Sequence, residues 1–222
     1  MSEPEDLMEL ETEYQGPKRG MDRAVLLAHG AGADMHAAAL TTLADALAAA
    51  KIPSLRFQYP YRSAGKKAPD RPPVLLAATR AAAAELARRT KLPPERLVLG
   101  GRSMGGRYCS LVVADEEDPV PCLGLVLLGY PLHAPGRPDK ERKDHFWRIT
   151  VPTLFVSGTR DPMAGAPALR RAVKRVKGPV TMHWIETGDH GFKPLKSSGL
   201  TLEGVLADVA ETTVAWVQGL PG

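Results

Sequence analysis

The sequence predicts an α/β fold with a mostly parallel sheet of about seven strands and helices on both faces. Short apolar runs alternate along the chain with Ala- and Leu-rich segments of helical length, a pattern typical of strands buried on both faces. The 222 residues are 44% hydrophobic, and no linker rich in Pro, Gly or Ser divides them. This composition favours a single domain over residues 1–222 that buries a sizeable core.

The expected elements follow from these runs in chain order. Core strands are expected to start near residues 24, 53, 96, 122, 152 and 180, and Met8–Tyr14 is expected to add an antiparallel edge strand. Helices are expected over about 35–51, 74–91, 104–115, 165–177 and 201–218, the last with a clear apolar stripe. Room for extra material exists after Tyr59 and after Tyr130. We therefore expect a pocket roofed by loops and no separate lid domain.

The motif Gly-Arg-Ser-Met-Gly at residues 101–105 joins an apolar strand pattern to helix-compatible sequence. This is the context of a nucleophile elbow, in which a sharp strand-to-helix turn holds a strained serine clear of the sheet. Gly101 and Gly105 fit this geometry, because a Cβ at either position would collide with a neighbouring element. The alternative is a Gly-rich turn in which Ser103 caps the helix.

A nucleophilic serine needs a base and an acid that orients the base. Asp161 follows the apolar run 151–158, and His190 follows the run 180–185, so both lie past strand ends, where open α/β sheets place their sites. Asp189 is the competing acid, but adjacent residues on a turn usually point apart, so we expect it to organise its loop. Among the other histidines, His183 lies within a predicted strand and is expected to be either packed or half-exposed.

Residues 29–34, His-Gly-Ala-Gly-Ala-Asp, follow the first core strand. Backbone amides in such a loop can stabilise the oxyanion of acyl transfer, together with the amide after the nucleophile. We therefore expect the amides of Ala31 and Met104 to form an oxyanion hole. His29 is expected to brace the loop, and Asp34 to cap a helix that begins near Met35.

These features carry a family resemblance. The motifs concerned are His-Gly-Ala-Gly-Ala-Asp-Met at 29–35, Phe-Gln-Tyr-Pro-Tyr at 57–61, Pro-Asp-Arg-Pro-Pro at 69–73, Gly-Arg-Ser-Met-Gly-Gly-Arg at 101–107, Leu-Gly-Tyr-Pro-Leu-His at 128–133, Gly-Thr-Arg-Asp-Pro at 158–162 and Gly-Asp-His at 188–190. Over about residues 20–219 the chain resembles the α/β-hydrolase superfamily and its small, dienelactone-hydrolase-like members. It is similar, more closely still, to testis-expressed and NSL-complex-subunit-like hydrolase-fold proteins. The resemblance implies a Ser103, Asp161, His190 triad and no cofactor. Some of these relatives serve as non-enzymatic components of complexes.

Charge is distributed unevenly along the chain. Lys and Arg number 29 and Asp and Glu 25, and six of the acidic residues lie within residues 1–17. Such an acidic start is the reverse of a secretory signal, so we expect a cytoplasmic protein without a membrane anchor. Basic residues gather in two segments that follow strands: Arg62, Lys66, Lys67 and Arg71, then Arg137, Lys140, Arg142 and Lys143. These are either solvated loop charges or a basic rim that attracts an anionic substrate.

The sequence thus predicts a serine hydrolase that cleaves small esters or related acyl substrates. Tyr59, Arg102 and Tyr130 are candidates for contacts with a small-molecule acyl substrate, which the basic rim suggests is anionic. No metal-ligand spacing or nucleic-acid-binding motif is present, and Cys109 and Cys122 are expected to be buried thiols. The alternative is a hydrolase-fold interaction or scaffold protein with little turnover. The oligomeric state is left open.

Overall fold

The computed structural model describes residues 8–221. Its strands form one seven-stranded sheet in the order β1-β3-β2-β4-β5-β6-β7. The strands are β1 (Thr12–Gln15), β2 (Ala24–Ala28), β3 (Ser54–Phe57), β4 (Leu97–Arg102), β5 (Gly124–Leu128), β6 (Thr153–Gly158) and β7 (Val180–Ile185). All neighbouring strands are parallel except β1 and β3, which are antiparallel. The predicted fold class is confirmed.

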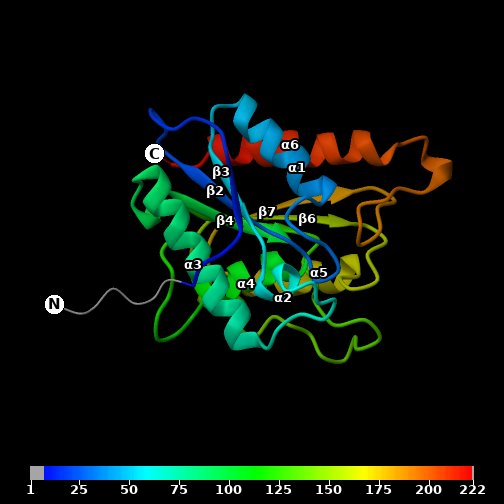
Figure 1. Cartoon of the computed structure of the whole chain (residues 1–222). Helices are drawn as coiled ribbons and strands as arrows, with labels where there is room; N and C mark the ends of the chain where they lie inside the picture. The colour runs from blue at the N-terminus through cyan, green and yellow to red at the C-terminus, as the bar shows by residue number, and fades with distance from the viewer. Residues whose placement is uncertain (1–7, 222) are drawn as a thin grey trace.

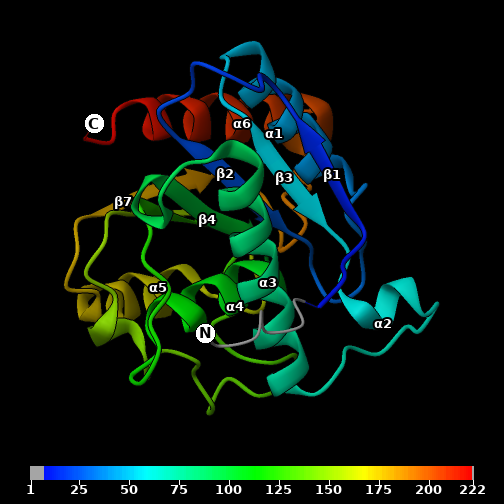
Figure 2. The same cartoon turned by 60° about the vertical axis from the view of Figure 1, so that its left-hand side comes forward.

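Helices cover both faces of this sheet (Figure 1). The helices are α1 (Ala38–Ala49), α2 (Pro60–Ser63), α3 (Pro72–Thr90), α4 (Met104–Val113), α5 (Ala166–Ala172) and α6 (Leu202–Gln218), with 3₁₀ turns at Pro94–Arg96, Phe146–Arg148, Val173–Arg175 and Lys196–Ser198. Helices α1 and α6 lie side by side on one face, and α3, α4 and α5 lie on the other (Figures 1 and 2). This two-sided cover explains why the central strands are mostly apolar.

Two hydrophobic cores result from the alternation of side chains along each strand. In β2, Leu26 faces the core under α3 and α4, whereas Val25 and Leu27 face the core under α1 and α6. In β5, Leu127 faces the core under α3 and α4, and Val126 faces the core under α1 and α6. A one-residue slip in either strand would exchange these sets, so the two cores hold the strand register in place.

The expected elements agree with the structure within a few residues, with one local exception. Asp34 does not cap α1, because the helix begins at Ala38 with Ala37 as its N-cap. Instead, Oδ1 of Asp34 accepts a hydrogen bond from the amide of His36 at 2.9 Å, within the turn that precedes the helix. The side chain stabilises that turn, and the first helical amides have no side-chain cap.

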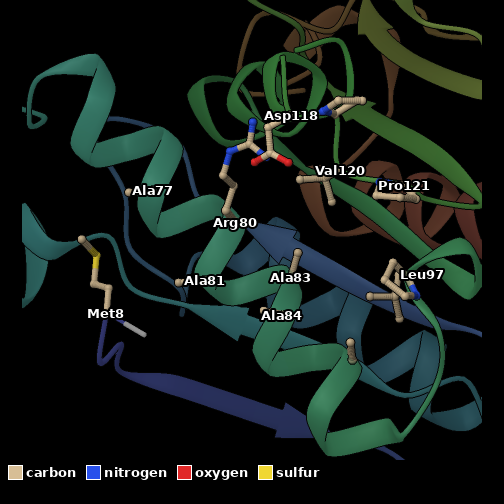
Figure 3. A pocket seen from close by; sticks show the side chains of 13 residues that line it. Met8, Ala77, Arg80, Ala81, Ala83, Ala84, Leu97, Asp118, Val120 and Pro121 are labelled. Atoms are coloured by element: carbon tan, nitrogen blue, oxygen red, sulfur yellow. The ribbon is translucent and has the colours of Figure 1, made fainter. Parts of the chain in front are cut away.

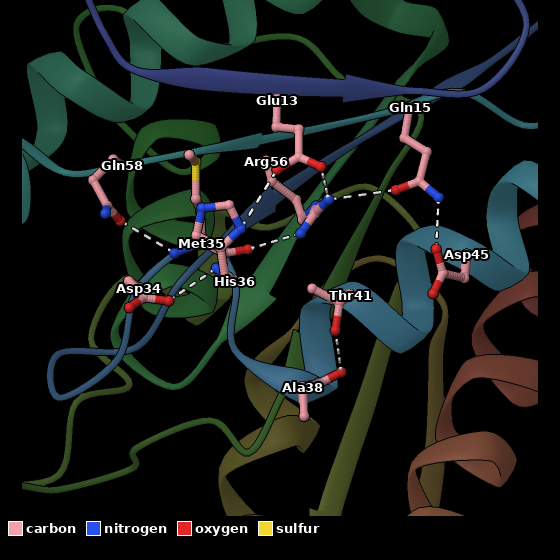
Figure 4. A network of polar contacts seen from close by, with 10 residues as sticks. All are labelled: Glu13, Gln15, Asp34, Met35, His36, Ala38, Thr41, Asp45, Arg56 and Gln58. Atoms are coloured by element: carbon pink, nitrogen blue, oxygen red, sulfur yellow. Dashed lines mark hydrogen bonds and ion pairs between the residues drawn. The ribbon is translucent and has the colours of Figure 1, made fainter.

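The edge strand β1 is held to β3 by a buried arginine (Figure 4). Arg56 on β3 is only 3% exposed, and its guanidinium pairs with Glu13 of β1 at 2.5 Å and donates to the carbonyl of Met35 at 3.1 Å. Because a buried guanidinium without partners is costly, these contacts tie the N-terminal strand to the sheet. Of the acidic N-terminal segment, residues 1–7 lie outside the described residues.

Among residues 8–221, no helix is both long enough and apolar enough to span a lipid bilayer. Cys109 and Cys122 are buried free thiols, as expected.

Candidate active site

The turn between β4 and α4 holds Ser103 in a backbone conformation that L-residues rarely adopt. Its φ is 50° and its ψ is −113°, and the strain of such a residue persists only where the surrounding structure imposes it. Here β4 ends at Arg102 and α4 begins at Met104, so the serine occupies the whole turn. The predicted elbow geometry is therefore present.

The two glycines of the motif are required by the close approach of β2. A Cβ at Gly101 or at Gly105 would run into the carbonyl oxygen of Ala28. The collision is with rigid strand backbone, so no side-chain rotation could relieve it. Glycine at both positions lets the elbow lie directly against the neighbouring strand.

His190 lies between Ser103 and Asp161 in one chain of hydrogen bonds. Its Nε2 atom is 2.9 Å from the Ser103 hydroxyl, and its Nδ1 atom is 2.8 Å from Oδ2 of Asp161. An ionised carboxylate can only accept, so Nδ1 carries the ring proton and Nε2 is left to accept from the serine. Asp161 is 2% exposed, and its other oxygen accepts from the amide of Met163 at 2.7 Å. The imidazole is thereby fixed in one tautomer and one orientation.

Asp189, the competing acid, holds its own loop together. Its Oδ1 accepts from the amides of Gly191 at 2.7 Å and Lys193 at 3.0 Å. The structure therefore brings Asp161, and not Asp189, to the imidazole of His190. A second His–Asp pair, His183 with Asp208 at 2.7 Å, joins β7 to α6 away from Ser103.

Arg102 braces the loop that carries His190. Its guanidinium donates to the carbonyl of His190 and lies over the ring of Phe192, 5.0 Å from the centroid. Arg102 lines the cavity at Ser103, as expected of a residue that contacts substrate. One of its guanidinium N–H groups is nevertheless used within the protein, by the carbonyl of His190. Burial lowers the pKa of this guanidinium.

The loop after β2 is positioned by buried polar contacts. His29 is fully buried; its Nε2 accepts from the amide of Tyr59 at 3.1 Å, and its Nδ1 donates to the carbonyl of Gly30 at 2.9 Å. The hydroxyl of Tyr61 donates to the carbonyl of Ala31 at 2.8 Å. Within the described part of the chain, the amides of Ala31 and Met104 donate no hydrogen bond. Both are therefore available to an oxygen atom beside Ser103.

A cavity of about 720 Å³ lies over these groups, and we call it the serine cavity. It is lined by Gly30–Ala33, by Ser103, Met104 and His190, and by loop residues that include Pro69, Asp70, Pro131, Pro135 and Met163. Pro69, Asp70, Pro131 and Pro135 come from the two segments in which lid-like material was expected, whereas Met163 comes from the loop between β6 and α5. The roof is thus made of loops, in agreement with the prediction.

Two of the three expected substrate contacts are placed elsewhere. Tyr59 is 0% and Tyr130 is 1% exposed. Their hydroxyls are bonded inside the protein, to Thr79 at 3.0 Å and to the carbonyl of Arg142 at 2.6 Å respectively. The prediction that these tyrosines contact substrate is wrong, because aromatic residues at strand ends are packed beneath the loops that form the cavity.

The basic segments also differ from the expectation. Among the described residues, the four basic side chains within residues 62–71 do not line the serine cavity, whereas Arg142 of the second segment does. Arg107 lines it too, although this residue was not predicted to contact substrate. The signal that could have found it is its position four residues after Ser103, on the same face of α4.

Another cavity of about 720 Å³ lies near the amino end of β4, where Leu97 is in its wall (Figure 3). Alanines of α3 and the segment Asp118–Pro121 form most of this lining. Its charged groups, Arg80 and Asp118, pair with each other at 2.8 Å. The lining thus combines no nucleophile with a base.

A family model described as an alpha/beta hydrolase domain matches residues 21–218. The chain belongs to this family. Solved structures with a similar fold include the dienelactone hydrolase of Anabaena variabilis, at a TM-score of 0.74 and 19% identity, with 96% of this chain and 93% of that chain covered. Est1E of Butyrivibrio proteoclasticus matches with a TM-score of 0.70 and 15% identity, over 94% and 95% of the two chains. The carboxylesterase of Bacillus cereus matches with a TM-score of 0.63 and 19% identity, over 95% and 94%.

One curated relative of this alpha/beta hydrolase is a much larger protein. A non-reducing polyketide synthase, ausA, of Aspergillus calidoustus is 29% identical over 111 residues, which cover 41% of this chain. The chain corresponds to 4% of the length of that synthase. The closer similarity to testis-expressed and NSL-complex-subunit-like proteins stays a prediction.

Proposed function

We propose that this alpha/beta hydrolase is a serine hydrolase of the carboxylic-ester type, which cleaves small esters or related acyl substrates. The observation that carries the proposal is the pair of hydrogen bonds of 2.9 Å and 2.8 Å that joins Ser103, His190 and Asp161 at the floor of the serine cavity. Esterases and a dienelactone hydrolase among the proteins of similar fold agree with it. The expected cytoplasmic location also stays a prediction.

The proposed reaction has two halves. The Ser103 oxygen attacks the substrate carbonyl while Nε2 of His190 accepts the hydroxyl proton, and the amides of Ala31 and Met104 bind the oxyanion. His190 then gives the proton to the departing alcohol, which leaves an acyl group on Ser103. Water, deprotonated by the same nitrogen, attacks this acyl group, and the proton returns to Ser103 as the acid leaves. Throughout, Asp161 orients the imidazole and stabilises its charged form.

A fluorophosphonate probe tests whether Ser103 is activated. We expect the probe to label the wild-type protein at Ser103, and we expect a panel of activated esters of increasing chain length to show turnover. Ser103→Ala should remove both signals. A folded wild-type protein that neither reacts with the probe nor hydrolyses any ester of the panel would overturn the proposal and favour an interaction protein.

A further inference from the structure

A second cavity, of about 520 Å³, lies beside the serine cavity, and basic side chains dominate its lining. We call it the cationic annexe. The two cavities share Arg107 and Arg142 in their linings, so these two side chains stand at the boundary between them. The charged residues that line the annexe are Arg107, Arg137, Lys140, Glu141, Arg142, Asp144 and Arg148.

Several of these charges are already balanced within the protein. Arg148 pairs with Glu116 at 2.6 Å, Arg137 lies 3.8 Å from Asp139, and Glu141 pairs with Lys143. Within the described part of the chain, Arg107, Lys140 and Arg142 form no ion pair, and neither does the remaining carboxylate of the lining, Asp144. The annexe therefore holds an excess of positive charge beside Ser103.

Arg107 is placed to serve a ligand of the serine cavity. Its amide donates to the carbonyl of Ser103 at 3.0 Å, so it lies one helical turn beyond the nucleophile, about 6 Å along the axis of α4. Its Nε atom is buried and has no hydrogen-bond partner among the described residues. Because this Nε is closed to solvent, an anion in the cavities would meet the terminal nitrogens of the guanidinium and not Nε, and the unpaired Nε shows that Arg107 is incompletely bonded within the protein.

Arg142 reaches the same place from a loop. Its carbonyl accepts from the hydroxyl of Tyr130 at 2.6 Å, and its amide donates to the carbonyl of Leu132 at 2.5 Å. Burial, and secondly the positive charge of Arg107, lower the pKa of the Arg142 guanidinium. Both side chains line the same two cavities, and two like charges there favour an anion between them.

We propose that the cationic annexe binds a phosphate group of the substrate, with Arg107 and Arg142 as its ligands, while the scissile carbonyl lies at Ser103. The inference rests on the proposed hydrolase function and names the class of substrate, a phosphorylated ester. A phosphate monoester carries about −1.5 to −2 charge and three acceptor oxygens. Three unpaired basic side chains against the unpaired carboxylate of Asp144 leave two positive charges in excess (3 − 1), which matches a phosphate better than the single charge of a carboxylate. Two of the three basic side chains present the planar fork that suits phosphate.

The kinetic test uses three acetyl esters of one short diol, whose second hydroxyl is free, phosphorylated or replaced by a carboxymethyl group. A second set carries the same groups at the end of the acyl chain, so that either side of the ester is sampled. At low ionic strength we expect kcat/KM of a phosphorylated ester to exceed that of its neutral counterpart by about 10- to 100-fold. Arg107→Gln and Arg142→Gln should each lower this ratio by about tenfold.

Matched variants keep the kinetic test specific. Arg142→Lys, which keeps the charge and loses the fork, should retain part of the preference. Lys66→Ala with Lys67→Ala removes two exposed charges outside both cavities, and should leave the ratio unchanged. If that control lowers the ratio as much as Arg107→Gln does, the preference arises from diffuse surface charge and the annexe proposal is wrong.

A binding test separates this inference from the proposed function. Inorganic phosphate should raise the unfolding temperature of Ser103→Ala in a saturable manner, and Arg107→Gln introduced into that protein should weaken the effect about tenfold. Hydrolysis of neutral and phosphorylated esters at equal rates would reject the annexe and retain the hydrolase. Absent turnover with saturable phosphate binding would reject the hydrolase and retain an anion site. An equal gain for the carboxymethyl ester would reject phosphate as the ligand.

Discussion

Two cavities of about 720 Å³ lie near opposite ends of β4, and they differ in chemistry and not in size. At the carboxyl end, the serine cavity contains a strained Ser103, a bonded His190 and two unused amides. The cavity at the amino end, which is lined mainly by alanines of α3, is called the alanine-lined cavity. Its charged groups are Arg80 and Asp118, which pair with each other. Parallel strands bring their carboxyl-end loops together at one edge, so polar groups converge there. Volume alone therefore does not identify a functional site.

The largest expected difference between the two cavities is catalytic. Ser103→Ala should lower kcat by on the order of 10⁶ because the triad acts as a unit, and His190→Ala should do comparable damage. The matched control is Ala84→Ser, which places a hydroxyl in the alanine-lined cavity and should leave kcat unchanged. Steady-state ester hydrolysis and thermal unfolding would be measured together. Full activity of a folded Ser103→Ala protein would contradict the proposed nucleophile.

The choice of acid provides the next test. Asp161→Asn should lower kcat by on the order of 10⁴, because the amide no longer fixes the His190 tautomer. Asp189→Asn keeps one acceptor for the amides of Gly191 and Lys193 and should have a much smaller effect. The comparison of kcat for the two variants decides between the acids. A crippled Asp189→Asn enzyme beside a nearly active Asp161→Asn enzyme would reverse the assignment.

The buried side chain of His145, in the lining of the cationic annexe, makes the free energy of unfolding depend on pH. Burial, and to a smaller extent Arg107 and Arg148, lower the pKa of His145 to about 4. The unfolded value is about 6.5, so the unfolded chain binds more protons between these values, and stability falls as the pH drops through this window. The expected loss between pH 7 and pH 4 is up to about 3 kcal/mol.

Urea unfolding at several pH values would measure this contribution of His145. His145→Gln keeps a polar partner for Ser110 and should remove this contribution. Plots of the free energy of unfolding against pH should then differ in slope between wild type and variant from about pH 6.5 to pH 4. His183→Gln is the control, because His183 is a partly exposed histidine on β7. Parallel curves for wild type and His145→Gln would show that His145 is not buried in its neutral form.

Arg102 tests how the His190 loop is held. Arg102→Met keeps an unbranched apolar stem but removes the guanidinium and its hydrogen bond to the carbonyl of His190. We expect kcat to fall by about tenfold, because a loosened imidazole spends less time in reach of the serine. The rate of fluorophosphonate labelling should fall in parallel, whereas KM for a neutral ester should change little. A change in KM alone would assign Arg102 to substrate binding, as predicted from the sequence.

The smallest effect is expected in the alanine-lined cavity. Ala81→Leu adds apolar surface to its wall and should change the free energy of unfolding by less than about 1 kcal/mol. Ester hydrolysis should not change, because the cavity lies at the other end of the strand. Chemical denaturation and steady-state kinetics would measure both quantities. A loss of activity in this variant would show that the two ends of β4 are coupled.

Much of the fold could be predicted because its signals are local. Buried strands and amphipathic helices leave periodic patterns within a few residues, and the strand–serine–helix motif is itself a contiguous segment. The order of Ser103, Asp161 and His190 along the chain, each after a strand, also predicted that they would meet. The parallel sheet brings such positions to one edge regardless of the loop lengths between them.

The fate of individual polar side chains could not be predicted in the same way. Tyr59 and Tyr130 were expected at the cavity and are buried, and Asp34 was expected to cap a helix and stabilises a turn instead. Local sequence shows that a tyrosine lies near a strand end, but the packing of distant loops decides which of its sides is covered.

By itself, therefore, the sequence determined the sheet, its helical cover and the positions from which a serine, a histidine and an acid could converge. Only the tertiary structure decided which aspartate reaches the imidazole, which tyrosines are covered, and that Arg107 of α4 and Arg142 of a distant loop stand together beside Ser103. The physical reason is the sequence separation over which the interactions act. Periodicity and turn geometry act between neighbours in the chain, whereas burial and the meeting of charges depend on contacts between segments that are far apart in sequence.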